Sequence, residues 1–136
     1  MKEADVETLV KYRIEQARTA LADARCLLDG AGSPQSIINR SYYAMFYAVL
    51  ALLQRTGKVP SKHTGVVGLF DSEFIREGIL PRELSRDLHR AFDARQAADY
   101  RFTDPLEPAE AREAWEKASR FVEAIAAHLR QPSAKA

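Results

Sequence analysis

The hydrophobic pattern is dominated by one stretch near the middle of the chain that has no polar face. From Tyr42 to Leu53 twelve consecutive residues are apolar, and Asn39 and Arg40 stand just before them. A helix that is apolar on all sides must be surrounded by other elements, and a bilayer-spanning helix needs roughly 20 apolar residues. The stretch therefore predicts the central helix of a soluble bundle, with polar residues at the start of this helix. We expect no membrane segment.

Other segments repeat apolar residues at intervals of three and four, which is typical of amphipathic helices. The pattern predicts helices over about 5–29, 34–55, 62–78, 81–102 and 108–130. Ser33 and Ser61 are the expected N-caps of the second and third helices. No strand-like alternation appears, so we expect an all-α, up-down antiparallel bundle of about five helices. Residues 1–130 would form one domain, and residues 131–136 a flexible tail.

Charge and cysteine content restrict the function classes. The net charge of +1 provides no global attraction to nucleic acid or membranes, so such binding would require a local patch. The only cysteine, Cys26, cannot form an internal disulfide, which favours a cytoplasmic protein; we expect it beside the core. No basic-then-apolar leader opens the chain. Because no residues have metal-ligand spacing and no glycine-rich phosphate loop occurs, we expect neither a metal nor a cofactor.

Arg95 occupies an apolar position on the predicted fourth helix, and Asp99 follows one turn later. A buried guanidinium without a partner costs several kcal/mol, so Arg95 must find one. One interpretation is a structural ion pair between Arg95 and Asp99. The other is that Arg95 faces phosphate in a cleft and Asp99 orients it.

The start of the second helix carries a second polar group, Asn39 and Arg40. If the second and fourth helices run antiparallel, the start of one meets the end of the other. The residues that then gather at one end of the bundle are Asn39, Arg40, Tyr43, Arg95, Asp99 and Tyr100. Two cations, two phenols and an amide there predict a phosphate or nucleotide site, although Arg40 at a helix start also suits simple extension to solvent.

Two histidines are further candidates for acid–base chemistry. His63 follows Lys62 near the start of the third helix, where anions are favoured, and a capping or surface role is the simpler alternative. His89 lies seven residues after Arg82 on the predicted fourth helix.

Taken together, residues 39–46, 61–66 and 95–100 resemble the HEPN domain family, most closely its small stand-alone prokaryotic type found beside minimal nucleotidyltransferases. The similarity extends from the first helix to about Leu129. It implies a helical up-down bundle that forms a homodimer and acts on RNA or nucleotides, often as the toxin of a toxin–antitoxin pair.

Active proteins of this type are metal-independent ribonucleases built on an Arg-x(4–6)-His motif, with the motifs of two subunits meeting at the dimer cleft. Arg95 matches the motif arginine, but Asp99-Tyr100 stands where the family has histidine-x-tyrosine. Arg82 and His89 have the spacing of the motif, but they lie one to two helical turns before its expected position. An aspartate beside arginine is a poor proton carrier near neutral pH, because the cation lowers its pKa.

These observations support three hypotheses. The first is a HEPN module that binds nucleotide or RNA phosphate and works with a nucleotidyltransferase-fold partner, with Arg95 and Asp99 as its altered catalytic pair. The second is an active ribonuclease toxin that uses His63 or His89. The third is a structural helper that binds no ligand.

Overall fold

The computed structural model describes residues 2–98 and 106–132, apart from the side chain of His63, and these residues contain helices and no strand. The elements are α1 (Glu3–Asp29), α2 (Pro34–Thr56), α3 (His63–Phe70), the π-helical turn η1 (Asp71–Ile75), α4 (Arg82–Ala98) and α5 (Pro108–Leu129). The predicted all-α architecture is confirmed. None of the helices in the described part of the chain is both long enough and apolar enough to cross a bilayer.

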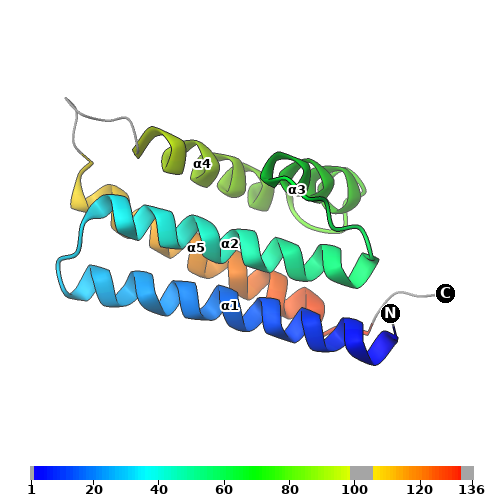
Figure 1. The fold of residues 1–136 in the computed structure, drawn as a ribbon. Coiled ribbons are helices and arrows are strands. Elements are labelled where there is room, and N and C mark those ends of the chain that lie inside the picture. The colour runs from blue at the N-terminus through cyan, green and yellow to red at the C-terminus, as the bar shows by residue number, and fades with distance from the viewer. Residues whose placement is uncertain (1, 99–105, 133–136) are drawn as a thin grey trace.

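The long helices alternate in direction (Figure 1). Helix α1 and helix α4 each run antiparallel to α2, and α5 returns in the direction of α2. Helix α2 packs against α1, α3, α4 and α5, so it is the central helix that its apolar stretch predicts. The start of α2 and the end of α4 consequently lie at the same end of the bundle.

The interface between α1 and α2 is built from small side chains. Five core alanines from these two helices are almost completely buried: Ala17, Ala20, Ala44, Ala48 and Ala51. Small residues allow two helix backbones to approach closely, and α1 and α2 make the most extensive contact between described helices. Tyr42, Val49 and Leu53 have no exposed surface, which shows how completely the bundle encloses α2.

Two helix starts differ in how well the sequence predicts them. Ser33 caps α2 as expected, since its Oγ accepts a hydrogen bond from the Ser36 N–H at 3.2 Å. The expectation for Ser61 is wrong, because α3 begins at His63 and its N-cap position is Lys62. Pro60 packs closely on the first turn of α3, where a Cβ at Gly65 would lie 3.0 Å from the proline Cβ.

The predicted third helix proves to be two elements. Helix α3 ends at Phe70, and the π-helical turn continues the chain to Ile75. The rings of Phe70 and Phe74 stack with centroids 6.3 Å apart, and both side chains are buried. A π turn adds one residue per turn and so leaves no regular three-and-four spacing to predict it. Cys26 also differs from expectation, since it is exposed on α1.

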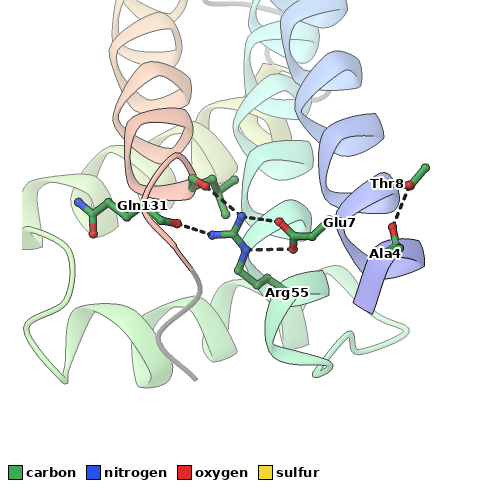
Figure 2. Close-up of polar contacts among 6 residues, drawn as sticks. Ala4, Glu7, Thr8, Arg55 and Gln131 are labelled. Atoms are coloured by element: carbon green, nitrogen blue, oxygen red, sulfur yellow. Dashed lines mark hydrogen bonds and ion pairs between the residues drawn. The ribbon is translucent and has the colours of Figure 1, made fainter. Parts of the chain in front are cut away.

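Arg55 links α1, α2 and the end of α5 through hydrogen bonds, at the end of the bundle opposite the start of α2 (Figure 2). Its NH2 donates to Glu7 Oε1 at 2.8 Å and to the Leu129 carbonyl at 2.9 Å, and its NH1 donates to the Gln131 carbonyl at 3.3 Å. One guanidinium thereby joins α1, α2 and the terminal carbonyls of α5. Gln131, the first residue of the expected tail, is held by this contact.

We expect Arg55→Met to lower the free energy of unfolding by roughly 1–3 kcal/mol, because the Arg55 side chain is only 18% exposed and its loss leaves a carboxylate and two carbonyls without their donor. Urea denaturation measures this change. Arg18→Met is the matched control, since Arg18 and Glu123 form a pair at 3.6 Å with both side chains more than half exposed. Equal effects of the two substitutions would contradict the role of Arg55.

His128 lies on α5, near Arg55 of α2. Its ring is edge-on to that of Phe74, with the ring centroids 6.2 Å apart. Burial first, and then the positive charge of Arg55, lower the pKa of His128 below its usual value of 6.5. The unfolded chain therefore binds more protons just below pH 6.5, and stability falls as the pH decreases from 6.5 towards the folded-state pKa.

We expect the free energy of unfolding to decrease more steeply between pH 7 and pH 5 in the wild type than in His128→Gln, which has no titrating group at this position. Denaturation series at several pH values measure the two slopes. Parallel slopes would contradict a lowered His128 pKa.

Candidate functional site

A cleft of about 450 Å³ opens where the start of α2 meets the end of α4. Its described lining consists of Leu27, Gln35, Ser36, Asn39, Arg40, Arg95 and Ala98. Asn39, Arg40 and Arg95 are therefore brought together, as an antiparallel arrangement of α2 and α4 requires. Asp99 and Tyr100, the other two polar residues expected here, lie outside the described residues.

Arg95 occupies its apolar helix position by lying on aromatic rings. Its Cζ atom is 5.1 Å from the ring centroid of Tyr42 and 5.5 Å from that of Tyr43. Its NH1 donates a long hydrogen bond of 3.5 Å to the Tyr43 hydroxyl. A guanidinium within about 6 Å of a ring face gains roughly 0.5–2 kcal/mol and keeps its N–H groups directed to the ring edges. The aromatic pair explains why arginine fits on a core-facing stripe.

The N–H group at Nε of Arg95 donates no hydrogen bond to a described residue. This atom is buried and has no hydrogen-bond partner within residues 2–98 and 106–132. A buried donor without an acceptor costs about 1–3 kcal/mol. Arg95 therefore keeps hydrogen-bonding capacity that the described residues do not use.

Arg40 is fixed by its neighbour in sequence and by the same tyrosine. Its Nε and NH2 donate to Asn39 Oδ1 at 3.3 and 3.1 Å, and its Cζ lies 5.3 Å from the Tyr43 ring centroid. Arg40 and Arg95 thus share the ring of Tyr43. Arg40 is half-buried rather than extended freely into solvent.

The charge of the described lining is positive. It contains two guanidinium groups and no carboxylate. Gln35 and Ser36 belong to the first turn of α2, where the helix dipole favours anions. The end of α4 carries the opposite partial charge, which Arg95 in its last turn offsets. Within the described lining, the start of α2, Arg40 and Arg95 therefore all favour an anion.

Tyr42 provides a surface for Arg95 and is not an ionised group. Its side chain is fully buried, and burial raises the pKa of Tyr42 to about 12, with Arg95 opposing and Tyr43 adding to the rise. Its hydroxyl, like the Oγ of Ser41, has no hydrogen-bond partner among the residues with described positions. Tyr42 stays neutral at physiological pH and offers its ring face to the guanidinium.

The candidate histidines are placed elsewhere. His89 Nε2 lies 2.6 Å from Asp71 Oδ2, on the side of α4 that faces η1. His63 is the first residue of α3, at the opposite end of the bundle from the start of α2, and its side chain lies outside the described part. Neither His89 nor His128 belongs to the described lining of the cleft.

Sequence reasoning missed the support that Tyr42 gives to Arg95, and it missed four lining residues of the cleft: Leu27, Gln35, Ser36 and Ala98. Tyr42 follows Asn39 by one helical turn, which is the available signal that it lies on the same side of α2. Leu27 gives no polar signal, and its place follows only from the turn that joins α1 to α2. No cluster of three or more histidine, cysteine or carboxylate side chains in the described residues is arranged to hold a metal ion.

Comparison with known proteins identifies the family of this fold. The family model described as HEPN domain matches residues 10–129. A UPF0332 protein of Thermotoga maritima is 37% identical over 119 residues, which are 88% of this chain and 89% of its own. Two Methanocaldococcus jannaschii proteins are also similar. "Putative toxin MJ0605" is 30% identical over 127 residues, 93% of each chain, and "Putative toxin MJ0142" is 42% identical over 74 residues, 54% of this chain and 50% of its own. The resemblance seen in the sequence is confirmed, and the chain belongs to the HEPN domain family.

Proposed function

We propose that this protein is the toxin-like HEPN module of a toxin–antitoxin-type pair and that it binds the phosphate of RNA or a nucleotide in the cleft of Asn39, Arg40 and Arg95. The observation that carries the proposal is the arrangement of the two guanidinium groups. Both are held on tyrosine rings around one cleft whose described lining has no carboxylate.

Phosphate suits this arrangement for two reasons. A guanidinium binds phosphate oxygens through two parallel N–H groups, and stacking on rings fixes its plane before the ligand arrives. The buried Nε of Arg95 has no acceptor among the described residues, and in this proposal a phosphate oxygen supplies one. In this proposal Arg40 and Arg95 contact phosphate, Asn39 orients Arg40, and Tyr43 fixes the position of both. Asp99 and Tyr100 are proposed to complete the site.

Family membership and the names of the relatives support the wider assignment. We propose a homodimer that works with a minimal nucleotidyltransferase protein, because the motifs of this chain resemble the HEPN type found beside such proteins. Since the described lining of the cleft contains no histidine, we assign the cleft to binding rather than to RNA cleavage.

Arg95→Ala and Arg40→Ala are expected to weaken binding of a labelled single-stranded RNA by about 10- to 100-fold, because each removes a charge-assisted contact to phosphate. Each should also lower the slope of log affinity against log salt by about 0.7. Fluorescence anisotropy at several salt concentrations measures both quantities. Arg86→Ala is the control, because Arg86 is exposed on the same helix.

Circular dichroism and thermal unfolding check that each variant is folded. A folded Arg95→Ala variant with wild-type RNA affinity would exclude this site. If the wild type binds neither RNA nor nucleotides, and Arg95→Ala only loses stability, the protein is a structural helper.

A second candidate function, an active ribonuclease, is favoured by the contacts of His89. Asp71 accepts hydrogen bonds from Ser85 Oγ at 2.7 Å and lies 2.6 Å from His89 Nε2. A carboxylate only accepts hydrogen bonds, so His89 Nε2 donates to Asp71 and this contact orients the imidazole ring. The His89 side chain is 51% exposed, which leaves it accessible to RNA.

If His89 acts as a general base, pure protein should cleave RNA in the presence of a chelator, and His89→Ala should lower the rate by about 10²–10⁴-fold. Electrophoresis of a labelled RNA measures the rate. His128→Gln is the control for loss of a histidine. Loss of cleavage in His63→Ala alone would assign the chemistry to His63, and an inactive wild type would exclude this second function.

A further inference from the structure

A second cavity, of about 290 Å³, adjoins the cleft across the side chain of Arg40. Its walls include Tyr12, Glu15, Thr19 and Asp23 of α1 with Arg40 and Tyr47 of α2. Arg40 lines both hollows, so a ligand bound in one lies one side chain away from the other.

We propose that this cavity holds the nucleoside of a ribonucleotide whose phosphate lies in the Arg40–Arg95 cleft. The inference rests on the proposed function and specifies its ligand. The cavity and the cleft would together accommodate one nucleotide unit, either free or within an RNA chain.

Aromatic side chains provide surfaces on which a base can stack. Tyr12, which is 52% exposed, and Tyr47, which is half-buried, both line the cavity. The Tyr47 ring lies 6.0 Å from that of Tyr43, which carries both cationic groups of the cleft. Stacking between a base and an aromatic ring is tolerant of sequence and contributes substantially to binding of single strands.

The two carboxylates of the cavity favour a nucleoside over a second phosphate as its occupant. Neither Glu15 nor Asp23 has an ion pair or hydrogen bond to another residue that the structure describes. Free carboxylates repel phosphate, whereas they accept hydrogen bonds from ribose hydroxyls and from base amino groups. Gln16 Oε1 already accepts from Arg13 NH1 at 2.8 Å, which leaves the Gln16 amide N–H groups as donors.

A basic protein segment is the main alternative occupant, since it would also pair with carboxylates. The positions of Arg40 in the cavity wall and of Arg13 over the Tyr12 ring, at 5.9 Å, place positive charge where such a segment would bind. A ligand with hydrogen-bond donors at one end and an anion at the other matches the cavity and the cleft better.

The test measures the binding affinities of adenosine 5′-monophosphate and inorganic pyrophosphate by calorimetry. The affinity for a short single-stranded RNA is measured by fluorescence anisotropy. We expect Tyr12→Ala and the double variant Glu15→Gln/Asp23→Asn to weaken binding of the nucleotide, the RNA or both by about tenfold. Pyrophosphate binding should stay unchanged. These substitutions are at exposed positions and leave the core intact.

Ile79→Ala and Glu116→Gln are the controls, because both side chains are exposed and lie outside the cavity and the cleft. An effect on the nucleotide alone assigns the cavity to free nucleotides, and an effect on the RNA alone assigns it to an RNA residue. Unchanged binding of both ligands, or equal changes for pyrophosphate and nucleotide, would overturn the inference. If Arg95→Ala nevertheless weakens RNA binding as expected above, the proposed function stands. A wild type that binds none of the three ligands overturns both the proposed function and this inference.

Discussion

Helix α2 is enclosed by its neighbours, and this burial constrains every polar group of the protein. Along its middle the helix contacts α1, α3, α4 and α5, so a charge placed there would have to give up its hydration. The two arginines of α2 accordingly lie near its ends. Arg40 stands in its second turn at one end of the bundle, and Arg55 stands in its last turn at the other.

These two arginines differ in how their donors are used. Arg55 has a carboxylate and two backbone carbonyls around it, and this set satisfies it within the chain. Among the described residues, Arg40 has only the amide oxygen of Asn39 and the ring of Tyr43, and Arg95 is held mainly by ring faces. Aromatic rings stabilise a cation without neutralising it. Within the described residues, arginine therefore has its charge paired with a carboxylate at one end of the bundle and keeps its charge unpaired at the other.

Much of the fold follows from the sequence, because periodic burial fixes the helices and prolines and glycines fix most of their ends. The meeting of Arg40 with Arg95 follows from one topological assumption about α2 and α4. What could not be predicted depends on contacts without periodicity, such as the π turn, the ring support of Arg95 by Tyr42 and the exposed cavity wall on α1. In the sequence, Glu15 and Asp23 fit an ordinary solvated helix face. Only the position of α2 beside α1 shows that they line a cavity.

The distribution of charge at this end of the bundle argues for one ligand rather than two. A pair of independent anion sites would place cations in both hollows, yet the second cavity carries Glu15 and Asp23 beside Arg40. If these carboxylates served only solubility, nothing would require them to line a hollow with Tyr12 and Tyr47. A nucleotide has the same asymmetry, because its phosphate is an anion and its sugar and base present donors and an aromatic face. Arg40, at the boundary between the two hollows, would then contact the phosphate at the point where it joins the nucleoside.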